Sequence, residues 1–521
     1  SLVFQKIHPL SIAHRPSSIC GNQSINQSRM QPSSDNNDNN NNDDDPSSSS
    51  STKRVPRQEY GSKYKNPRLP ESVPMIGLGC SSFSKFFWKD DNDDNNKNHI
   101  NFFIHCASAE EKAMGIKDDD DELKLVNPNH PMVQEWIDTI LFAIQDCGID
   151  LLDTAPWYGH GISEMVLGYA LQKYYYYQQQ QKEEESSSLS QQQQQDEKTK
   201  NIRNSLIVNT KIGRYERCPK EQFDFSYDTT IRSVKRSIQR MNCYYINVLQ
   251  LHDPEFSHSK ELLMKETIPA MIKCRAELGY CKALGMTGYP LETQYEIFQF
   301  TLEHFGSSTK KDNNTLLSLQ DIWDQSLTYG HFNLHDRTLL TSSSFHYNDL
   351  HYSSSKNNDN NDNDDNNNNK KQMRVIGSFL DYCHDHSIHV MAAAPLSMGL
   401  LTHEGPPSWH PANPPLKKAC QEAATICHQH SIDLSTLAIL FALSKNNNNI
   451  QLPCTLLGMK NKNQVQRAAS LANRFHSRNE KPQPSQKEEE NVATTYDYQQ
   501  IFTPQEYQVF QILNDPNDGP F

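Results

Sequence analysis

Residues 205–252 run from one apolar stretch, SLIVNTKIG (205–213), to another, YYINVLQLH (244–252). Between them, apolar residues recur at the three- and four-residue spacing of a helix that is buried on one side, namely Ile231, Val234, Ile238 and Met241. Two short runs that are apolar on both faces, joined by such a helix, are typical of a parallel βαβ unit. This stretch therefore predicts an α/β fold built on a parallel sheet.

The same alternation extends in both directions along the chain. The other runs of strand length are SVPMIGLG (72–79), GIDLLDTA (148–155), GYCKALGMTG (279–288), a weaker one near 326–329, IHVMAAAPL (388–396) and CTLLGM (454–459). His130 and Pro131 are placed to begin a helix before the second run, and Gly148 to end it. Eight strands with helices between most of them favour a (β/α)8 TIM barrel. No G-x-G-x-x-G follows the first strand, which argues against a Rossmann fold.

Low-complexity tracts make the 521-residue chain longer than one barrel needs. Residues 35–45 and 357–369 consist of Asn and Asp alone. Such segments bury too little apolar surface to offset the entropy of ordering. We therefore expect residues 1–70 to be a disordered N-terminal segment. Residues 71–521 would form a single catalytic domain with disordered insertions near 93–128, 174–200, 341–371 and 475–497.

Charge and cysteine content exclude several classes of function. The net charge of -13 argues against a nucleic-acid partner, and no apolar run approaches the length of a membrane span. The 12 cysteines show no metal-binding spacing, which predicts no metal site and fits a reducing compartment. We expect a cytoplasmic protein with a small-molecule partner, although Lys6, Arg15 and Arg29, with no acid in the first thirty residues, faintly resemble a transit segment. The oligomeric state is not predicted.

Four polar residues lie at or just after the ends of three consecutive predicted strands. Asp153 ends the second strand and Tyr158 follows it, while Lys211 and His252 end the third and fourth. In a barrel these strand ends line the mouth where chemistry takes place. A phenol can exchange a proton with a substrate if an ammonium lowers its pKa; a carboxylate can hold that ammonium, and an imidazole can bind the substrate oxygen. Each residue alone has a structural explanation, but together they predict one catalytic site.

The stretch GIDLLDTAPWYGHGISEMVLGYAL (148–171) resembles the signature of the aldo-keto reductase family. Its Asp-Thr-Ala, Tyr-Gly and Ser-Glu-x-x-Leu-Gly follow at the spacings of that signature. The family's catalytic tetrad then corresponds to Asp153, Tyr158, Lys211 and His252, with Tyr158 as general acid and base. The resemblance implies an NAD(P)-dependent oxidoreductase on a (β/α)8 barrel.

Further stretches are similar to the L-galactose dehydrogenases of that family. They are NTKIGRYERC (209–218), FDFSYDTTIRSVKRSIQRM (223–241), VLQLHDPEF (248–256) and APLSMGLLTHEGPPSWHPA (394–412). This likeness implies oxidation of L-galactose at C1 to the 1,4-lactone, a step towards ascorbate. Trp409 and His410 are candidates for lining the sugar pocket, with loop packing as the alternative. Another aldose dehydrogenase, a reductase acting on a different sugar or aldehyde, and a non-catalytic regulatory barrel like the potassium-channel β subunits all stay open.

The family resemblance also implies where the cofactor binds. The nicotinamide would lie near the ends of the fifth to seventh strands, at Thr287, Tyr329, Leu396 and Ser397. The phosphates and adenosine would lie near the seventh and eighth strands, at Gly399, Gly458, Met459, Lys460 and Gln464. Lys460 is a cation where the galactose dehydrogenases tend to have a neutral residue. The resemblance implies NAD as the cofactor, whereas a cation at Lys460 could attract the 2′-phosphate of NADP, which makes NADP the alternative. A solvated turn is the structural explanation of this lysine.

Overall fold

The structure is a computed structural model of the whole chain. It describes residues 53–84, 101–117, 123–183, 201–215, 222–306, 318–341, 346–347, 374–375, 377–444, 451–479, 501–515 and 521. The chain divides into two units, Ser1–Thr52 and Lys53–Phe521. The first unit and the Asn/Asp tract at 357–369 lie outside the described residues, so the disorder expected there stays a prediction.

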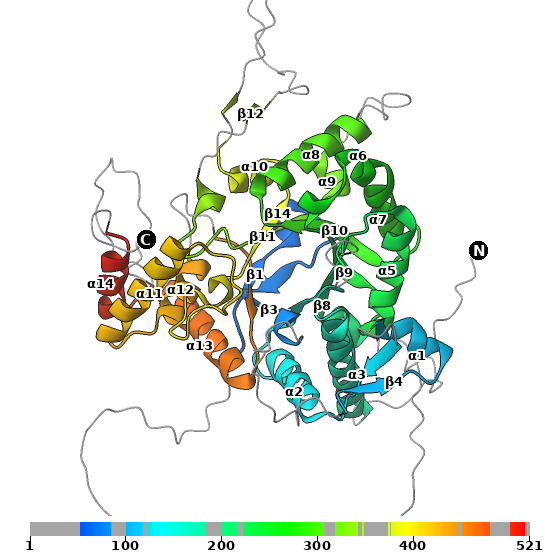
Figure 1. The fold of residues 1–521 in the computed structure, drawn as a ribbon, viewed down its shortest axis with the longest axis horizontal. Coiled ribbons are helices and arrows are strands. Elements are labelled where there is room, and N and C mark those ends of the chain that lie inside the picture. The colour runs from blue at the N-terminus through cyan, green and yellow to red at the C-terminus, as the bar shows by residue number, and fades with distance from the viewer. Residues whose placement is uncertain are drawn as a thin grey trace, which may run out of the picture. The chain divides into compact units, whose positions relative to one another are not determined.

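Eight parallel strands close into a barrel in chain order, which confirms the predicted fold class (Figure 1). The strands are β3 (Ile76–Gly79), β7 (Leu151–Asp153), β8 (Ile207–Ile212), β9 (Ile246–His252), β10 (Cys281–Gly288), β11 (Gln325–Tyr329), β14 (His389–Ala393) and β15 (Thr455–Gly458). The last strand pairs with the first, with Leu457 opposite Leu78. The carboxyl ends of all eight strands therefore meet at one end of the barrel.

Helices surround the barrel (Figure 1). The longer ones are α2 (Pro131–Gln145), α3 (Ile162–Glu183), α5 (Tyr227–Arg240), α7 (Ile268–Ala276), α8 (Leu291–Gly306), α10 (Phe379–Asp385), α11 (Pro414–Gln429), α12 (Leu434–Leu443), α13 (Lys462–Asn479) and α14 (Pro504–Leu513). Helix α2 begins as predicted, because His130 Nδ1 accepts a hydrogen bond from the Met132 N–H at 3.3 Å and Pro131 is the first helical residue. Gly148, with φ 68°, turns the chain from α2 towards β7.

In the described part of the chain no single helix is long and apolar enough to span a membrane, and one bent pair, α11 with α12, meets that test by length and composition alone.

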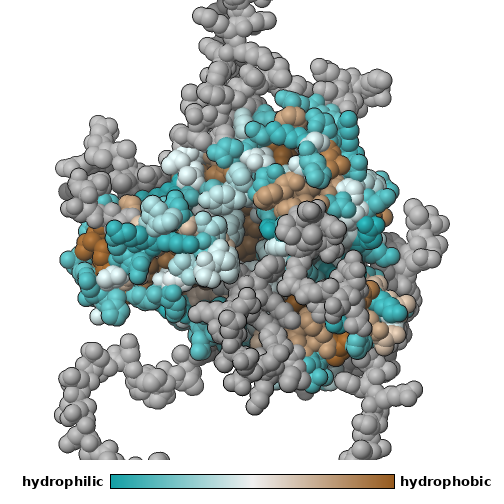
Figure 2. Space-filling view, viewed as in Figure 1, coloured by the Kyte–Doolittle hydropathy of each residue, from teal (hydrophilic) through white to brown (hydrophobic). Residues whose placement is uncertain are grey.

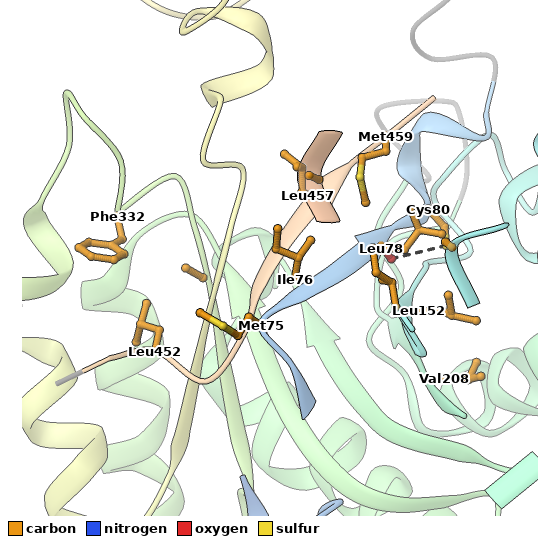
Figure 3. Packing of buried hydrophobic residues seen from close by; sticks show 14 of the residues in the cluster. Met75, Ile76, Leu78, Cys80, Leu152, Val208, Phe332, Leu452, Leu457 and Met459 are labelled. Carbon is orange, nitrogen blue, oxygen red and sulfur yellow. Dashed lines mark hydrogen bonds between the residues drawn. The ribbon is translucent and has the colours of Figure 1, made fainter. Parts of the chain in front are cut away.

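The main hydrophobic core lies between the barrel and the helices. Figure 3 shows part of it around β3 and β15, where Ile76, Leu78 and Leu457 lie among Leu152 and Met459. These side chains are at most 5% exposed. On the face seen in Figure 2 the described residues are mostly hydrophilic, with hydrophobic residues in separate patches. Burial of the apolar faces of strands and helices therefore supplies the main driving force for the fold.

A hairpin closes the end of the barrel opposite the strand carboxyl ends. It consists of β1 (Arg57–Glu59) and β2 (Ser72–Pro74), which pair antiparallel, and the 3-10 turn Gly61–Tyr64. Tyr60, Leu69 and Val73 pack against residues of the barrel interior, namely Leu151, Ile207, Val248, Ala283, Leu327, Met391, Cys454 and Leu456. The expectation of disorder is therefore wrong for residues 53–70. The single strand expected at 72–79 is divided between β2 and β3.

Asp324 anchors this hairpin to the barrel. Its fully buried carboxylate accepts hydrogen bonds from Arg68 Nε at 2.7 Å, from Asn66 Nδ2 at 2.8 Å and from the Leu284 N–H at 2.8 Å. Arg275 Nη1 lies 3.4 Å away and adds a second cation. A buried carboxylate with this many donors has its desolvation cost offset, and removal of the carboxylate would leave the donors unpaired.

The described parts of the insertion expected near 93–128 are also ordered. Strands β4 (Phe103–His105), β6 (Leu123–Val126) and β5 (Ile116–Lys117) form an antiparallel sheet, accompanied by α1 (Ala109–Met114) with a capping box from Ser108 and Glu111. Phe102, Ile116 and Val126 are buried in the main core, and that burial offsets the ordering entropy. Similarly, α3 and α13 extend into the insertions expected at 174–200 and 475–497, and β12 (His346–Tyr347) pairs with β13 (Arg374–Val375).

We expect the substitution Asp324→Ala to lower the free energy of unfolding by about 3–5 kcal/mol, the usual cost of removing one partner from a buried ionic cluster. Denaturant unfolding measures it. Asp138→Ala is the control, since Asp138 is 45% exposed and pairs with Lys173 at the surface, and it should cost less than about 1 kcal/mol. Equal effects of the two changes would mean that Asp324 does not anchor the hairpin.

Candidate active site

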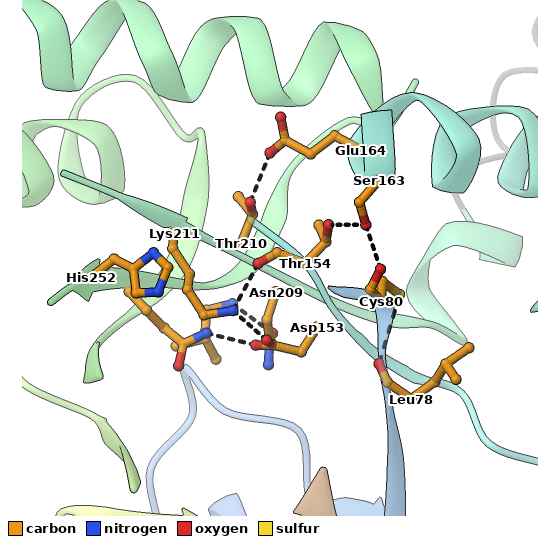
Figure 4. Close-up of polar contacts among 12 residues, drawn as sticks. Leu78, Cys80, Asp153, Thr154, Ser163, Glu164, Asn209, Thr210, Lys211 and His252 are labelled. Atoms are coloured by element: carbon orange, nitrogen blue, oxygen red, sulfur yellow. Dashed lines mark hydrogen bonds and ion pairs between the residues drawn. The ribbon is translucent and has the colours of Figure 1, made fainter. Parts of the chain in front are cut away.

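Three neighbouring strands deliver the predicted tetrad to one end of the barrel. Asp153 is the last residue of β7, Lys211 is the penultimate residue of β8, and His252 is the last residue of β9. Tyr158 lies on the loop between β7 and α3. Figure 4 shows Asp153, Lys211 and His252 side by side. The structure therefore brings the predicted residues together, as the strand-end argument expected.

A buried ion pair lies at the centre of this group. Lys211 Nζ donates hydrogen bonds to Asp153 Oδ1 and, at 2.9 Å, to the Thr154 carbonyl, and the lysine and aspartate side chains are 2% and 4% exposed. Burial opposes the charge on Lys211, but Asp153 and the Tyr158 hydroxyl outweigh it and raise the pKa of the ammonium above its usual value. Lys211 is therefore a permanent cation beside the tyrosine.

Tyr158 lies against both the ammonium and the imidazole. Lys211 Nζ is 4.8 Å from the centre of the phenol ring, and the His252 ring meets it edge-on with 6.2 Å between the ring centres. Burial raises the pKa of Tyr158, Lys211 lowers it, and Asp153 raises it further, with a net increase. The expected net lowering of this pKa is therefore wrong. The Lys211 ammonium lowers the pKa of Tyr158 as expected, but the desolvation of the phenol raises this pKa by more.

His252 is a neutral hydrogen-bonding group. Burial lowers its pKa to about 4, so the ring is uncharged at neutral pH. Its Nδ1 is buried and has no hydrogen-bond partner among the described residues, and its Nε2 lies 3.7 Å from Asp253 Oδ1, beyond hydrogen-bond distance. A buried ring nitrogen without a partner is costly unless a ligand or water completes it. The imidazole is thus free to bind a substrate oxygen next to the phenol.

The polar residues beneath the tetrad were not predicted from the sequence. Gln250 Nε2 donates to Asp153 Oδ2 at 2.7 Å, Gln325 Nε2 donates to Gln250 Oε1 at 3.2 Å, and the Tyr60 hydroxyl donates to Gln325 Oε1. This buried chain connects the hairpin with the catalytic carboxylate and fixes its second oxygen. Gln250 lies two residues before His252 on the same strand, so the period of two could have placed it on the inward face.

The residues expected near the nicotinamide lie at strand ends next to the tetrad. Thr287 is directly opposite His252 in the β9–β10 register, and Tyr329 ends β11. Leu396 and Ser397 follow β14. There Ser397, Met398 and Gly399 have φ values of 47°, 50° and 97°, a left-handed run that holds the loop in an unusual shape. Thr287, Tyr329, Leu396 and Ser397 therefore lie at or after strand ends, as expected. Their contact with a cofactor stays a prediction.

The backbone expected near the cofactor phosphates is open. Gly458 is exposed, and a Cβ added there would meet no atom closer than 4.0 Å, so a ligand has room beside the start of α13. The Met459 side chain is buried, and its carbonyl accepts from Ser82 Oγ at 2.9 Å. The Lys460 N–H donates to Gln464 Oε1 at 2.8 Å. These residues fit a dinucleotide, with the Lys460 ammonium exposed at the edge.

The two candidate sugar residues differ in their roles. His410 is 7% exposed; its Nδ1 accepts from the Ala412 N–H at 3.1 Å, and its Nε2 donates to the Ser397 carbonyl at 3.1 Å. With both ring nitrogens hydrogen-bonded to backbone groups, His410 fits the loop-packing alternative, and its place in a sugar pocket stays a prediction. Trp409 is 52% exposed, and its ring lies nearly parallel to that of His410 with 6.5 Å between the ring centres.

The model of the aldo/keto reductase family matches residues 127–314 and 360–480, more than half of the chain. The chain belongs to this family. It is 29% identical over 330 residues to L-galactose dehydrogenase of Arabidopsis thaliana, which covers 63% of this chain and 76% of that protein. It is 26% identical over 300 residues to D-arabinose 1-dehydrogenase of Saccharomyces cerevisiae, covering 57% and 66%.

A shorter match, 32% identical over 167 residues, relates the chain to D-threo-aldose 1-dehydrogenase of a Pseudomonas species, covering 28% of this chain and 42% of that protein. Among solved structures, an aldo-keto reductase from Bacillus halodurans in its holo form aligns with a TM-score of 0.42 and 16% identity, covering 80% of this chain and 90% of that one. The family membership makes the chain an oxidoreductase that uses a nicotinamide cofactor.

We expect Tyr158→Phe to lower kcat by at least ~100-fold, since it removes the group that exchanges a proton with the substrate. The melting temperature should change little. Tyr176→Phe is the control, because Tyr176 is 57% exposed on α3. Near-normal turnover by the Tyr158 variant would contradict the assignment of the general acid and base.

The oxidation rate should rise with pH. Oxidation needs the phenolate of Tyr158, and a pKa above its usual value keeps that form scarce at neutral pH. At NAD+ well below saturation, where ionisation of the free protein governs the rate, we expect about a tenfold gain per pH unit from pH 6 to 9. His252, with a pKa of about 4, should add no inflection in this range. A plateau that begins below pH 8 would contradict the protonated phenol.

Proposed function

We propose that the chain oxidises the C1 hydroxyl of an aldose with NAD+, and that its substrate is L-galactose, converted to L-galactono-1,4-lactone on the way to ascorbate in the cytoplasm. The observation that carries the proposal is the assembled group of Asp153, Tyr158, Lys211 and His252. The three relatives named above add the substrate class, because each is named as a dehydrogenase of an aldose sugar.

Each of the four residues would have a separate role in the oxidation. His252 donates a hydrogen bond to the C1 oxygen, and Tyr158 accepts the proton that this oxygen loses. The ammonium of Lys211 stabilises the phenolate that takes up this proton, and Asp153 keeps the ammonium in place. When bound, the nicotinamide accepts the hydride released from C1, which becomes the lactone carbonyl carbon. The hydride carries both electrons of the oxidation, and the proton goes to Tyr158.

The charges around the strand ends favour an uncharged substrate. Lys211 is paired with Asp153, and Arg214 is paired with Asp253 through Nη1 and Oδ2 at 2.6 Å. Each of these two cations thus has a carboxylate beside it, so in the described part of the site neither leaves a net positive charge to attract a phosphate or carboxylate group. A neutral sugar fits this balance better than an acidic metabolite.

The loop after β14 offers an apolar surface for a sugar ring. Trp409 lies on this loop, which follows a strand carboxyl end, and its ring is half exposed. Pro406 and Pro407 precede it and restrict the loop backbone, which lowers the entropy lost on binding.

The preference between NAD and NADP depends on Lys460 and has to be measured. The exposed ammonium of Lys460 could contact the 2′-phosphate of NADP.

A panel of sugars tests the proposal. We expect kcat/KM to be highest for L-galactose, intermediate for L-fucose, which lacks the C6 hydroxyl, and lowest for D-galactose, with NAD+ preferred to NADP+. Trp409→Ala should lower kcat/KM for L-galactose. Tyr244→Ala is the matched control, because this exposed aromatic residue precedes β9 and lies towards the opposite end of the barrel.

Two results would contradict the proposal in different ways. If D-galactose were the best substrate and the Trp409 variant were unchanged, L-galactose specificity would fail but aldose oxidation would not. If the protein bound NADH and oxidised no sugar, the proposed function as a whole would fail and the regulatory barrel would become the better explanation.

A further inference from the structure

An ion pair lies beside the tetrad on the loops that carry it. Arg214 follows β8 after Gly213, and Asp253 directly follows His252. Arg214 Nη1 donates to Asp253 Oδ2 at 2.6 Å, and the two side chains are 25% and 16% exposed. The pair therefore joins the ends of β8 and β9 at the level where Lys211 and His252 act.

Aromatic rings hold the guanidinium plane of Arg214. Its central carbon lies 4.0 Å from the ring centre of Trp157, the residue before Tyr158, and 5.3 Å from that of Phe223. Phe223 in turn stacks on Phe256 with 4.6 Å between the ring centres. A backbone bridge between Arg214 and Phe223 closes the base of this loop. A guanidinium fixed in this way loses little entropy when it binds a ligand.

The backbone of Asp253 is also held in a specific shape. Its φ and ψ of 50° and 52° lie in the left-handed region, which is uncommon for residues other than glycine. Its N–H donates to the Thr287 carbonyl at 2.8 Å, which ties the residue to the next strand. Strained backbone of this kind is retained where a side chain must point in one direction.

The pair keeps unused hydrogen-bonding capacity. Among the described residues Arg214 donates a hydrogen bond to Asp253 alone, and its Nε is buried without a partner. Asp253 Oδ1 lies 3.7 Å from His252 Nε2, too far for a hydrogen bond, so this oxygen can still accept one. A donor and an acceptor thus lie next to each other, one residue from the imidazole that would bind the C1 oxygen.

We propose that Arg214 and Asp253 recognise two neighbouring hydroxyl groups of the sugar ring, with the guanidinium donating to one oxygen and the carboxylate accepting from the other. This inference rests on the proposed function and narrows its substrate class to polyhydroxylated aldoses rather than simple aldehydes. Vicinal hydroxyls offer a donor and an acceptor at matching spacing, whereas a simple aldehyde would leave both groups unpaired. An epimer with one misdirected hydroxyl would be rejected for the same reason.

The test combines protein variants with modified substrates. Arg214→Met and Asp253→Asn are assayed with the aldose that the wild-type protein oxidises best and with analogues of it that lack a single ring hydroxyl. We expect kcat/KM for the parent sugar to fall about 10- to 100-fold, the scale of one hydrogen bond to a charged group. For the analogue that lacks the recognised hydroxyl, the same substitutions should change kcat/KM less than about twofold, because the contact is already absent.

A matched control separates recognition from general damage. Arg474→Met removes an arginine near the C-terminal end of α13, away from the strand carboxyl ends, where its Nη2 donates to Glu506 Oε1 at 2.9 Å, and it should leave every sugar unaffected. NADH binding should be unchanged in the Arg214 and Asp253 variants, since the pair would contact the sugar, and each variant is assayed at a temperature where it is fully folded.

Three outcomes would overturn the inference. Equal losses on the parent sugar and all analogues would mean that the pair only positions the tetrad, and no loss on any sugar would mean that it has no part in binding. In both cases an active wild-type protein would keep the proposed function intact. A wild-type protein that oxidises no aldose would instead remove the proposed function and this inference together, before any variant is compared.

Discussion

The site depends on a lysine ammonium kept inside the barrel next to a single carboxylate. Burying either charge alone would cost several kcal/mol, and the pair is stable only because nearly every polar atom is satisfied. Asp153 accepts from Lys211 on one oxygen and from Gln250 on the other, while Lys211 also donates to the Thr154 carbonyl. These contacts require β7, β8 and β9 to be adjacent and in one register. The pairing of these three strands therefore brings together the ion pair on which the phenol chemistry depends.

Support for this pair reaches the far end of the barrel. Tyr60, Gln325 and Gln250 form a buried hydrogen-bonded chain from the closing hairpin to Asp153. The hairpin is in turn held by Asp324 through Arg68 and Asn66. Amide groups in this chain fix orientation and cannot pass protons along it, so its role is positional. Stability at the closed end and geometry at the open end are thus coupled through the barrel interior.

The fold and the tetrad could be predicted because both follow from local patterns. Apolar runs of strand length predicted the barrel, and the positions of Asp153, Lys211 and His252 at strand ends predicted the site. The order of residues 53–70, 101–117 and 123–126 was not predicted because their few buried side chains, such as Tyr60 and Phe102, are spread through polar surroundings. Patterns along the chain also could not show how burial and charge balance in space. The raised pKa of Tyr158 and the use of both His410 nitrogens within its loop depend on neighbours distant in sequence.

Asp153 and Lys211 act as one unit, in which the carboxylate holds the ammonium that stabilises the Tyr158 phenolate. The most direct test is a double-mutant cycle on kcat with Asp153→Asn, Lys211→Met and the double variant, each checked for folding and NADH binding. If the two residues form a unit, either single change removes most of the rate, and the double variant is about as slow as the slower single one. Losses that multiply in the double variant would show that the residues contribute independently, and would contradict the ion pair as the basis of the site.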